Sequence, residues 1–342
     1  MRRPTLVSLA DQLGVSRQTV SNVINAPHLV RPETRERVEA AIKESGYQPN
    51  VAAQALRRQK SQTLAMRVYP TVDGGINGAV MDRFLHHAAL AVRRGGYRLL
   101  LVTADSFTEE VQVLSDLHHR GTIDGCILTD SHGGDERQTK LAEIGLPAAT
   151  FGRPWGEEDT VAGLWVDVDG AAGTYLATRE LLRRGHRRIG FLGWPEGSEV
   201  GADRRRGWLE AMAEAGIKDC EGWQAEGLDR MESGLDGMNS LLEKDVKAVV
   251  CASDSLAVGA LEALRRSGEL GGDHAPVIGF DNTPVARALG LSSIDQPVET
   301  AVDTLCDALI AQLATGAAPS VVTLLEPQLV VRDLGLMYVK NP

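Results

Sequence analysis

The sequence has few cysteines, and none of them forms a CxxC pair. The four that are present lie far apart, at Cys126, Cys220, Cys251 and Cys306. A zinc site or a redox dithiol needs closely spaced thiols, and a disulfide-rich secreted domain needs more of them in a shorter chain. We therefore expect four buried, reduced thiols in a cytoplasmic protein.

The sequence also lacks a long apolar run. No window is apolar for the length needed to cross a bilayer, and the segment after Met1 is polar where a secretory signal would have its apolar core. Hydrophobic residues make up 43% of the chain and charged residues 24%, which is ordinary for a globular protein. We expect no membrane association, and two or three domains within the 342 residues.

Motifs of common catalytic sites are absent as well. The chain has no GxSxG, P-loop, GxGxxG or HExxH motif. The pairs His86-His87 and His118-His119 are adjacent in sequence, so on a helix their side chains face different directions and cannot easily share a metal ion. We expect no enzymatic activity, no cofactor and no metal site.

Charge is distributed unevenly along the chain. The first 60 residues contain 10 Lys and Arg against 5 Asp and Glu, a net charge of +5. The whole chain has a formal net charge of −10, so the remaining residues have a net charge of −15. A small basic module on a large acidic body favours binding of a polyanion at one end, with an affinity that falls steeply with salt.

Residues 5–25 have the pattern of two short helices joined by a tight turn. The first helix has an apolar face at helical spacing, formed by Leu6, Leu9, Ala10 and Leu13. Gly14 suits the positive φ at which such a helix ends, and Ser16 can cap the next helix. The spacing predicts a helix-turn-helix, whose second helix enters the DNA major groove.

The second helix of this pair has an apolar and a polar face. Its inward residues are Val20, Val23 and Ile24. The outward face has hydrogen-bonding side chains with no core to enter, namely Arg17, Gln18, Ser21, Asn22 and Asn25. Such a face suits reading base edges, although an ordinary helical hairpin with a solvated face is the alternative for this window taken alone.

A third helix and a short basic segment follow. Pro32 opens a helix that runs to about Ser45, and Gly46 ends it. Residues 47–60 are rich in alanine and end in basic residues, and a helix this short barely forms alone in water. We expect this segment to order on DNA as a hinge, with Leu56 inserted into the minor groove as an apolar wedge.

These features occur together at fixed spacing. The residues involved are Gly14-Val15-Ser16, Gln18-Thr19-Val20-Ser21, Val23 to Asn25, Thr34 to Ala41, Tyr47, Pro49-Asn50 and Leu56. Residues 5–58 resemble the headpiece and hinge of the lactose-repressor (LacI/GalR) family of bacterial transcription regulators.

Two residues depart from this resemblance. The family usually has Arg at the position of Asn22, and Ser or Thr as the helix cap at the position of Arg31. Arg reads guanine whereas Asn pairs with adenine, so we expect the operator base opposite Asn22 to differ from the family's usual one. Arg31 offers a cation to a phosphate in place of a cap, and Pro32 partly offsets the lost cap by presetting φ.

The polar face and the resemblance together predict the DNA contacts. We expect Arg17, Gln18 and Asn22 to read bases, with mere solvation as the alternative for any one of them. The other predicted DNA-binding residues contact the backbone, orient the second helix or belong to the hinge, and they are Leu6, Ser16, Thr19, Ser21, Asn25, Arg31, Thr34, Tyr47, Asn50, Ala53 and Leu56.

From about Thr63 onward, apolar strands alternate with helical stretches, as in parallel α/β sheets. The predicted strands are 64–69, 98–103, 125–129, 148–152, 164–168, 188–193, 248–251 and 277–281. The predicted helices are 80–94, 109–120, 170–184, 204–215, 234–244, 255–267 and 298–314. The fold class is therefore a small all-α headpiece with a hinge helix, joined to an α/β core.

Several short motifs of this core can be matched to a known architecture. They are Gly95-Gly96-Tyr97, Asp124-Gly125, Val166 to Asp169, Gly185 to Ile189, Arg204 to Trp208, Ser253-Asp254, Gly279 to Asp281 and Gln296-Pro297. The core resembles the two-lobed regulatory core of the same family, which is itself similar to the periplasmic sugar-binding proteins.

The resemblance implies a headpiece (1–49), a hinge (50–62) and a core (63–342). The first lobe of the core would contain about 63–184 and 295–325, and the second 185–294 and 326–342. The chain would cross between the lobes near Gly185, Asp295 and Glu326. Ligand would bind between the lobes, and their closure would change the spacing of two headpieces.

The carboxyl ends of the predicted strands locate the pocket, because open α/β sheets bind ligands outside these ends. The family carries ligand-binding residues at the positions of Arg204, Ser253 and Asp281. A carboxylate facing an Arg suits the vicinal hydroxyls of a sugar, although capping the following helix is the alternative role for Asp167 and Asp254. The predicted effector-binding residues are Tyr69, Asn77, Thr129, Asp130, Trp155, Asp169, Trp194, Arg204, Asp229, Ser253 and Asp281.

The chain has five tryptophans, which are candidates for stacking on sugar rings. Trp155 and Trp194 follow predicted strand ends and are the candidates for the cleft. Trp208 is expected in the core, where the family has a structural aromatic residue. Several stacked tryptophans would favour an oligosaccharide over a single sugar.

The sequence thus predicts a homodimeric repressor that binds a pseudopalindromic double-stranded operator and is released by a mono- or oligosaccharide. The segment 333–342 contains no heptad repeat, so we expect a dimer and not a tetramer. A regulator that responds to a purine, or to a corepressor that tightens DNA binding, stays open. A sugar-transport binding protein needs export and no headpiece, and a sugar-modifying enzyme would turn its ligand over, so both fit less well.

Overall fold

The computed structural model describes residues 4–47, 60–68, 78–156, 163–270, 276–317 and 321–332. Contacts divide the chain into two compact units, Met1–Ser61 and Gln62–Pro342, which are the headpiece unit and the core unit. Outside the described residues lie the expected hinge residues Asn50, Ala53 and Leu56, the expected pocket residues Tyr69 and Asn77, and the segment 333–342.

The described part of the headpiece unit is helical. It contains α1 (Leu6–Leu13), α2 (Arg17–Asn25), the 3-10 helix η1 (Pro27–Leu29) and α3 (Pro32–Ser45). Gly14 ends α1 at a φ of 63°. Ser16 caps α2 by accepting a hydrogen bond from the Thr19 amide at 3.0 Å. The helix-turn-helix predicted from residues 5–25 is confirmed.

The headpiece has a small apolar core, formed by Leu9, Ala10, Val20, Val23, Val38 and Ala41. Ser21 is buried as well, with 7% of its surface exposed, although the sequence placed it on the outward face. The reason is that α2 packs against both α1 and α3, so its buried face is wider than its apolar stripe. The Arg31 side chain makes no capping hydrogen bond to α3, as we expected from the replacement of Ser or Thr by Arg.

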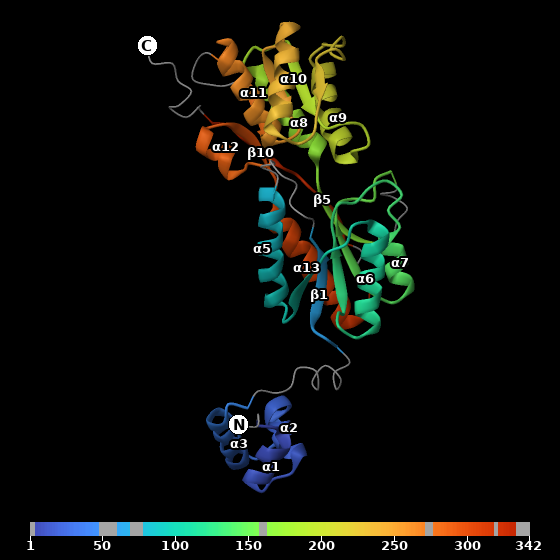
Figure 1. The fold of residues 1–342 in the computed structure, drawn as a ribbon, viewed down its shortest axis with the longest axis vertical. Helices are drawn as coiled ribbons and strands as arrows, with labels where there is room; N and C mark the ends of the chain where they lie inside the picture. Colours follow the sequence, from blue (N-terminus) through green and yellow to red (C-terminus); the bar gives the residue numbers. More distant parts are fainter. Residues whose placement is uncertain are drawn as a thin grey trace. The chain divides into compact units, whose positions relative to one another are not determined.

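The core unit contains two six-stranded sheets (Figure 1). The first has the order β11-β5-β4-β3-β1-β2 and is parallel throughout. Its strands are β1 (Thr63–Arg67), β2 (Arg98–Val102), β3 (Gly125–Leu128), β4 (Ala148–Phe151), β5 (Leu164–Val168) and β11 (Val322–Leu325). We call this sheet with its helices the N-lobe.

The second sheet has the order β12-β10-β9-β8-β6-β7, and only β12 runs antiparallel to its neighbour among these paired strands. Its strands are β6 (Ile189–Gly193), β7 (Gln224–Glu226), β8 (Ala248–Cys251), β9 (Val277–Phe280), β10 (Ser292–Asp295) and β12 (Gln328–Val330). We call this sheet with its helices the C-lobe.

Helices cover both faces of the N-lobe sheet, with α5 and α13 on one side and α6 and α7 on the other (Figure 1). They are α5 (Gly78–Arg94), α6 (Phe107–His119), α7 (Arg137–Glu143) and α13 (Val298–Thr315). Side chains of β1 alternate between the two layers, because Leu64 and Met66 join the α5–α13 cluster and Ala65 joins the other. Both faces are therefore apolar, as parallel sheets require.

The C-lobe helices are α8 (Gly170–Arg183), α9 (Glu199–Glu214), α10 (Met231–Glu243), α11 (Asp254–Ser267) and α12 (Pro284–Leu289). Their apolar faces share one large core with the second sheet. Trp208 is fully buried in that core, as the sequence predicted, and its indole donates to the Ile189 carbonyl at 3.2 Å.

The first crossing between the lobes lies earlier than the sequence led us to expect. It falls between β5 and α8, near Asp169, and not near Gly185, because α8 packs on α9 and on strands of the second sheet. Small residues make this packing close: a Cβ on Gly173 would lie 2.7 Å from Phe280. The other crossings lie between β10 and α13 and between β11 and β12.

The predicted strands of both sheets agree with the structure to within two residues. The elements that the sequence did not predict are short or lie at sheet edges, namely β7, β10, β11, β12, α7 and α12. The edge strands β7 and β11 are not fully buried, so they lack the continuous apolar run that marks a central strand.

The contact between α10 and α11 depends on two glycines. A Cβ on Gly259 would lie 2.0 Å from the Met231 carbonyl, and a Cβ on Gly234 would lie 2.1 Å from the Leu256 carbonyl. Backbone atoms cannot give way as a flexible side chain can, so added volume must separate the helices. We expect Gly259→Ala to lower the free energy of unfolding by about 1–3 kcal/mol.

The matched control is Gly222→Ala, because a Cβ there meets nothing within 4 Å and the backbone needs no positive φ. Urea unfolding of the full chain, followed by tryptophan fluorescence, compares the two variants. Equal unfolding midpoints would show that the helices separate without cost and would contradict the expectation.

Candidate functional site

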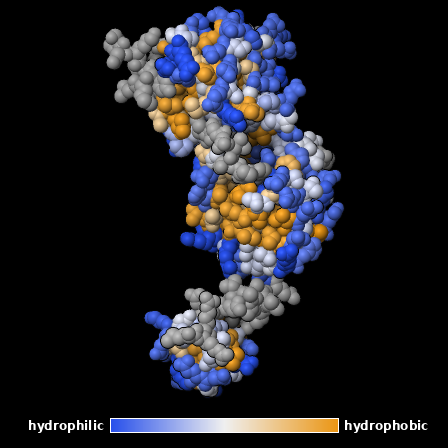
Figure 2. Space-filling view, viewed as in Figure 1, coloured by the Kyte–Doolittle hydropathy of each residue, from blue (hydrophilic) through white to orange (hydrophobic). Residues whose placement is uncertain are grey.

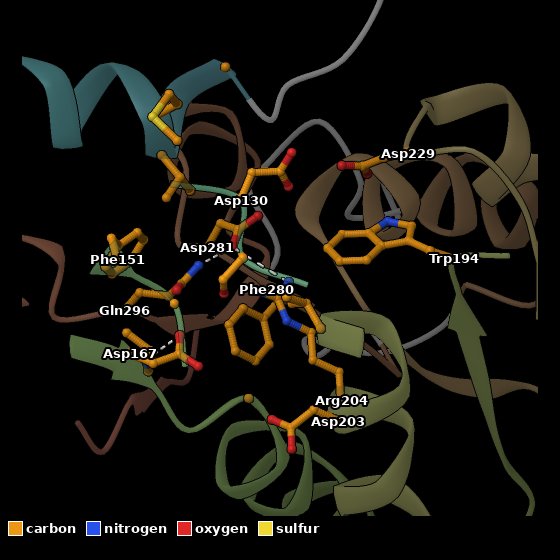
Figure 3. Close-up of a pocket in the computed structure, with 18 of the residues that line it drawn as sticks. Asp130, Phe151, Asp167, Trp194, Asp203, Arg204, Asp229, Phe280, Asp281 and Gln296 are labelled. Carbon is orange, nitrogen blue, oxygen red and sulfur yellow. Dashed lines mark hydrogen bonds and ion pairs between the residues drawn. The ribbon is translucent and has the colours of Figure 1, made fainter. Parts of the chain in front are cut away.

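A cavity of about 780 Å³ lies between the two lobes, at the carboxyl ends of their strands (Figure 3). The N-lobe contributes residues that follow or end β3, β4 and β5, among them Asp130, Trp155 and Asp167. The C-lobe contributes Trp194 after β6, Arg204 on α9, Asp229 after β7, and Phe280 and Asp281 at the end of β9.

Asp281 has a strained backbone conformation at the wall of the cavity. Its φ is 103° and that of Asn282 is 48°, a region that residues with side chains rarely adopt. The Asp281 amide donates to the Ile294 carbonyl at 2.8 Å, and Gln296 Nε2 donates to Asp281 Oδ1 at 2.6 Å. The surrounding contacts therefore fix both the backbone and the carboxylate of Asp281.

A second carboxylate, Asp254, holds the loop after Asp281 in place through hydrogen bonds. It accepts hydrogen bonds from the Thr283 amide and from Ser293 Oγ, both at 2.7 Å. Ser293 Oγ in turn accepts from the Asn282 amide at 3.0 Å. Burial, with the nearby Asp281 charge, raises the pKa of Asp254 to about 7. Asp254 thus positions Asp281 and does not itself line the cavity.

This raised pKa predicts a pH-dependent stability. The unfolded carboxyl ionises near 3.8, whereas the folded one keeps its proton to about pH 7. Because the folded state binds more protons between these values, the free energy of unfolding falls as the pH rises from about 4 to 7. We expect Asp254→Asn to remove the part of this fall that Asp254 contributes, since the amide places Oδ1 at Thr283 and donates from Nδ2 to Ser293 Oγ.

Urea unfolding at pH 5 and at pH 8 measures this effect. At each pH, the free energy of unfolding of the native chain is subtracted from that of Asp254→Asn. This difference should be larger at pH 8 than at pH 5. The exposed Asp307 on α13 provides the matched control, and Asp307→Asn should keep the native pH dependence. A pH profile of Asp254→Asn that matches the native one would contradict the assignment.

Arg204 is buried at the centre of the site. Its guanidinium donates to the Ala252 carbonyl, and its Nη1 lies 3.8 Å from Asp281 Oδ1. It also lies 3.7 Å above the Phe280 ring and 5.1 Å from the Trp194 ring. Its Nε is buried and has no hydrogen-bond partner among the described residues. Arg204 therefore retains a donor for a ligand.

Two buried carboxylates face Arg204. Burial raises the pKa of Asp281 and of Asp229, and the charge of Arg204 opposes both shifts. Ser253 Oγ donates to Asp229 Oδ1, and a hydrogen bond from the Trp194 side chain also lowers the pKa of Asp229. Hydroxyl groups of a ligand would stabilise the charged carboxylates, because each hydroxyl donates a hydrogen bond.

Arg153 connects the lobes at the back of the cavity. Its Nε donates to Asp167 Oδ2 in the N-lobe at 2.6 Å, and its Nη2 lies 3.3 Å from Asp203 Oδ2 on α9 of the C-lobe. The same guanidinium lies 4.4 Å from the Trp155 ring. On another loop, the Gly133 amide donates to Glu199 Oε1 of α9 at 2.9 Å. Both contacts join the lobes in this structure.

The structure places the described effector residues of the prediction in two groups. Those that line the cavity are Asp130, Trp155, Trp194, Arg204, Asp229 and Asp281. Thr129, Asp169 and Ser253 are not among its lining residues. Asp169 caps α8 through the Ala172 amide at 2.9 Å, and Ser253 caps α11 while it holds Asp229. Their binding role stays a prediction.

Sequence reasoning did not assign several lining residues, namely Phe151, Asp203, Phe280 and Gln296. Asp203 precedes Arg204 on α9, but the predicted helix began only at Arg204, whereas α9 begins at Glu199. Asp167, considered only as a possible helix cap, lines the cavity and pairs with Arg153. The position of Asp167 at the end of a predicted strand could have indicated that it lines the cavity.

The predicted DNA-reading face lies on α2 of the headpiece. Arg17 and Gln18 are exposed and Asn22 is half-buried. Gln18 Nε2 donates to Asn22 Oδ1 at 2.8 Å, which places both amides on one face of the helix. Leu6 packs against the headpiece core, and Ser16 and Thr19 share a hydroxyl contact of 2.8 Å.

The described residues do not form a membrane span or a metal site. None of the helices in the described ranges is both long and apolar enough to span a membrane. Likewise, the described side chains contain no group of three or more His, Cys, Asp or Glu placed to hold a metal ion. The four cysteines are free and buried, as the sequence predicted.

Two family models match the chain in the regions just described. Residues 5–50 match the model of bacterial regulatory proteins of the lacI family, which covers the helix-turn-helix. Residues 178–333 match the model of a periplasmic binding protein-like domain, which covers most of the C-lobe.

Individual proteins are similar over nearly the whole chain. The HTH-type transcriptional regulator CelR of Thermobifida fusca is 34% identical, covering 98% of this chain and 99% of the relative. A structure of a transcriptional regulator CelR–cellobiose complex is 32% identical, with a TM-score of 0.67 over 97% of this chain and 100% of that one. The operator-bound Lac repressor dimer, 24% identical, shares the fold with a TM-score of 0.82 over 97% of this chain and 99% of that one. The chain belongs to the lacI family of bacterial regulatory proteins.

Proposed function

We propose that this chain is a transcriptional repressor that binds a pseudopalindromic operator as a homodimer and is released by a carbohydrate. The observation that carries the proposal is the Asp281–Arg204 pair, buried in the cavity between the lobes of a chain that also has a helix-turn-helix headpiece. A headpiece gives the chain a DNA target, and a ligand cavity gives it a signal that can change DNA binding.

The cavity has the chemistry of a carbohydrate site. Carboxylates and a guanidinium that face each other bind adjacent hydroxyl groups, and indole rings stack on the apolar faces of sugars. Asp281, Arg204 and Trp194 supply these groups within one cavity. The similar structure of a CelR–cellobiose complex supports the same ligand class for this chain.

Exposed apolar side chains on the N-lobe support the homodimer. Leu90 on α5 and Leu101 on β2 are 50% and 45% exposed, and α5 contacts β2, an edge strand of its sheet. Figure 2 shows apolar residues gathered on the N-lobe face where α5 and α13 lie. A second copy would cover such a face, and two headpieces would then read an inverted repeat.

The DNA-binding part of the proposal rests on the headpiece. Its exposed Arg17 and Gln18 lie on the helix that enters the major groove in helix-turn-helix proteins. The net charge of +5 in the first 60 residues attracts the phosphate backbone. A repressor of this kind acts in the cytoplasm, where bacterial operator DNA lies.

Selection of DNA duplexes from a random library tests this proposal. The full chain, without effector, is immobilised and washed with non-specific competitor DNA at a fixed salt concentration. We expect one enriched sequence with two half-sites in inverted orientation. Failure to enrich any sequence would contradict the repressor function, and a single unrepeated half-site would contradict the dimer.

A further inference from the structure

We propose that the effector is an uncharged carbohydrate of at least two sugar rings, bound without a phosphate group. The inference rests on the proposed function, because it names the chemical class of the ligand in the cavity between the lobes. Three features carry it: two indoles on opposite lobes, polar groups without partners, and an excess of carboxylates.

Each of the two indoles, one in each lobe, lies beside an arginine. Trp155 follows β4 of the N-lobe and has the Arg153 guanidinium 4.4 Å from its ring centroid. Trp194 follows β6 of the C-lobe and has the Arg204 guanidinium 5.1 Å from its ring centroid. Each arginine occupies one side of an indole and holds it in place, which leaves another side for a ligand ring.

The cavity is large enough for more than one ring. Its volume of about 780 Å³ lies in the upper part of the range of roughly 300–1,000 Å³ found for small-molecule sites. Figure 3 shows Asp281 and Gln296 apart from Asp229 and Trp194, so polar groups occupy two places in it. Two linked sugar rings would meet both places, whereas a single ring would leave one of them unoccupied.

The residues that line the cavity supply both hydrogen-bond donors and acceptors. Among the described residues, Arg204 Nε and Trp155 Nε1 are buried without a hydrogen bond, and the carboxylates of Asp229 and Asp281 line the same cavity. Arg204 is itself 6% exposed, so water does not compensate for the missing partner as it would at the surface. Hydroxyl groups donate and accept, and they satisfy this mixed set better than a phosphate, which has acceptor oxygens.

Carboxylates outnumber cations along the cavity walls. The acidic lining residues are Asp82, Asp130, Asp167, Asp203, Asp229 and Asp281, against Arg204 and Arg230. Arg153 pairs with Asp167 and Asp203, and Arg204 lies 3.8 Å from Asp281.

This excess of negative charge discriminates between ligands. A sugar phosphate would bring a further negative charge beside the carboxylates of Asp229 and Asp281, and like charges placed together cost several kcal/mol in binding. The effector must therefore reach the protein from a step that does not phosphorylate it, such as glycoside hydrolysis or transport without phosphoryl transfer.

Isothermal titration of the full chain with matched sugars tests the proposal. The probes are glucose and glucose 6-phosphate, trehalose and trehalose 6-phosphate, and the disaccharides cellobiose, maltose and lactose. We expect one uncharged disaccharide to bind at least about tenfold more tightly than glucose. We expect each phosphorylated sugar to bind about 100-fold more weakly than that disaccharide.

Binding of glucose and of the disaccharide to Trp155→Ala tests whether the second sugar ring contacts Trp155. This variant should weaken disaccharide binding about tenfold while it leaves glucose binding unchanged, because it removes contacts to one ring only. The matched control is Trp223→Ala, since Trp223 also has an arginine, Arg188, 5.1 Å from its ring but does not line the cavity. Trp223→Ala should bind both sugars as the native chain does.

The outcomes separate this inference from the proposed function. A glucose or sugar-phosphate effector that binds as tightly as any disaccharide and releases the operator would overturn the inference and keep the carbohydrate-responsive repressor. Equal weakening of glucose and disaccharide by Trp155→Ala would also overturn the assignment of two rings. If no carbohydrate binds or releases the operator, both the inference and the proposed effector class are wrong.

Discussion

Asp281→Asn is expected to bind the operator as the native chain does, yet to need about 10- to 100-fold more carbohydrate for release. The reason is that Asp281 offers the ligand a charged acceptor, whose hydrogen bonds are stronger than those of a neutral amide. Arg204, 3.8 Å away, favours the charged form of this buried carboxylate. The Asn side chain lacks this charge, so it binds the hydroxyl groups of the ligand more weakly.

The substitution keeps the size of the side chain, so the loop should keep its shape. An Asn at this position still offers an oxygen to Gln296 Nε2, which donates to Asp281 Oδ1 in the native chain. Asp116→Asn on α6 is the matched control, because Asp116 is 73% exposed and lies outside the cavity. Anisotropy of a labelled operator duplex gives both affinities. Unchanged sensitivity of Asp281→Asn to the carbohydrate would contradict the assignment of the cavity.

Arg17→Ala should weaken operator binding about 10- to 100-fold and leave carbohydrate affinity unchanged. Arg17 is the first residue of α2 and is exposed, so a bidentate contact to a base is open to it. The loss should be largest on the selected operator and small on unrelated DNA, because a base contact discriminates between sequences and a phosphate contact does not.

The control for Arg17→Ala is Arg183→Ala at the end of α8. Arg183 is 73% exposed and pairs with Glu180, so its loss also removes one positive charge from the surface. It should change neither operator nor carbohydrate affinity. Equal losses for Arg17→Ala on specific and unrelated DNA would assign Arg17 to the phosphate backbone and contradict its role as a base reader.

The sequence predicted the central strands of both sheets because they are buried on both faces. Runs such as Ala248–Cys251 are apolar throughout, and that pattern does not depend on which helices cover them. Edge strands such as β7 carry polar residues and form only because a neighbouring strand pairs with them. Likewise, the family resemblance implied a crossing near Gly185, whereas the packing of α8 on α9 decides that α8 belongs to the C-lobe.

Part of the site followed from one general rule, that ligands bind at the carboxyl ends of parallel strands. This rule located Asp130, Asp281 and Trp194, all of which line the cavity. It could not separate lining residues from helix caps, since Asp169 caps α8 two residues after Asp167, which lines the cavity. Side-chain direction distinguishes such neighbours, and it depends on tertiary packing.

Contacts between distant segments were not accessible from the sequence. The Arg153 contact with Asp203 requires the relative position of two lobes, which one sequence does not encode in any local pattern. The brace of Asp254 on Thr283 and Ser293 joins three separate segments in the same way. Ser21 is a third case, because the second and third helices together decide the width of its buried face.

The most direct test of the account is one titration of an operator complex with carbohydrate. The full chain is bound to its selected, fluorescently labelled duplex at a fixed salt concentration, and anisotropy is followed as uncharged disaccharides are added. The account predicts that one of them lowers the anisotropy to that of free duplex, and that Asp281→Asn shifts this release to higher concentration. An operator complex that no carbohydrate releases, or one that carbohydrate tightens, would contradict the carbohydrate-released repressor.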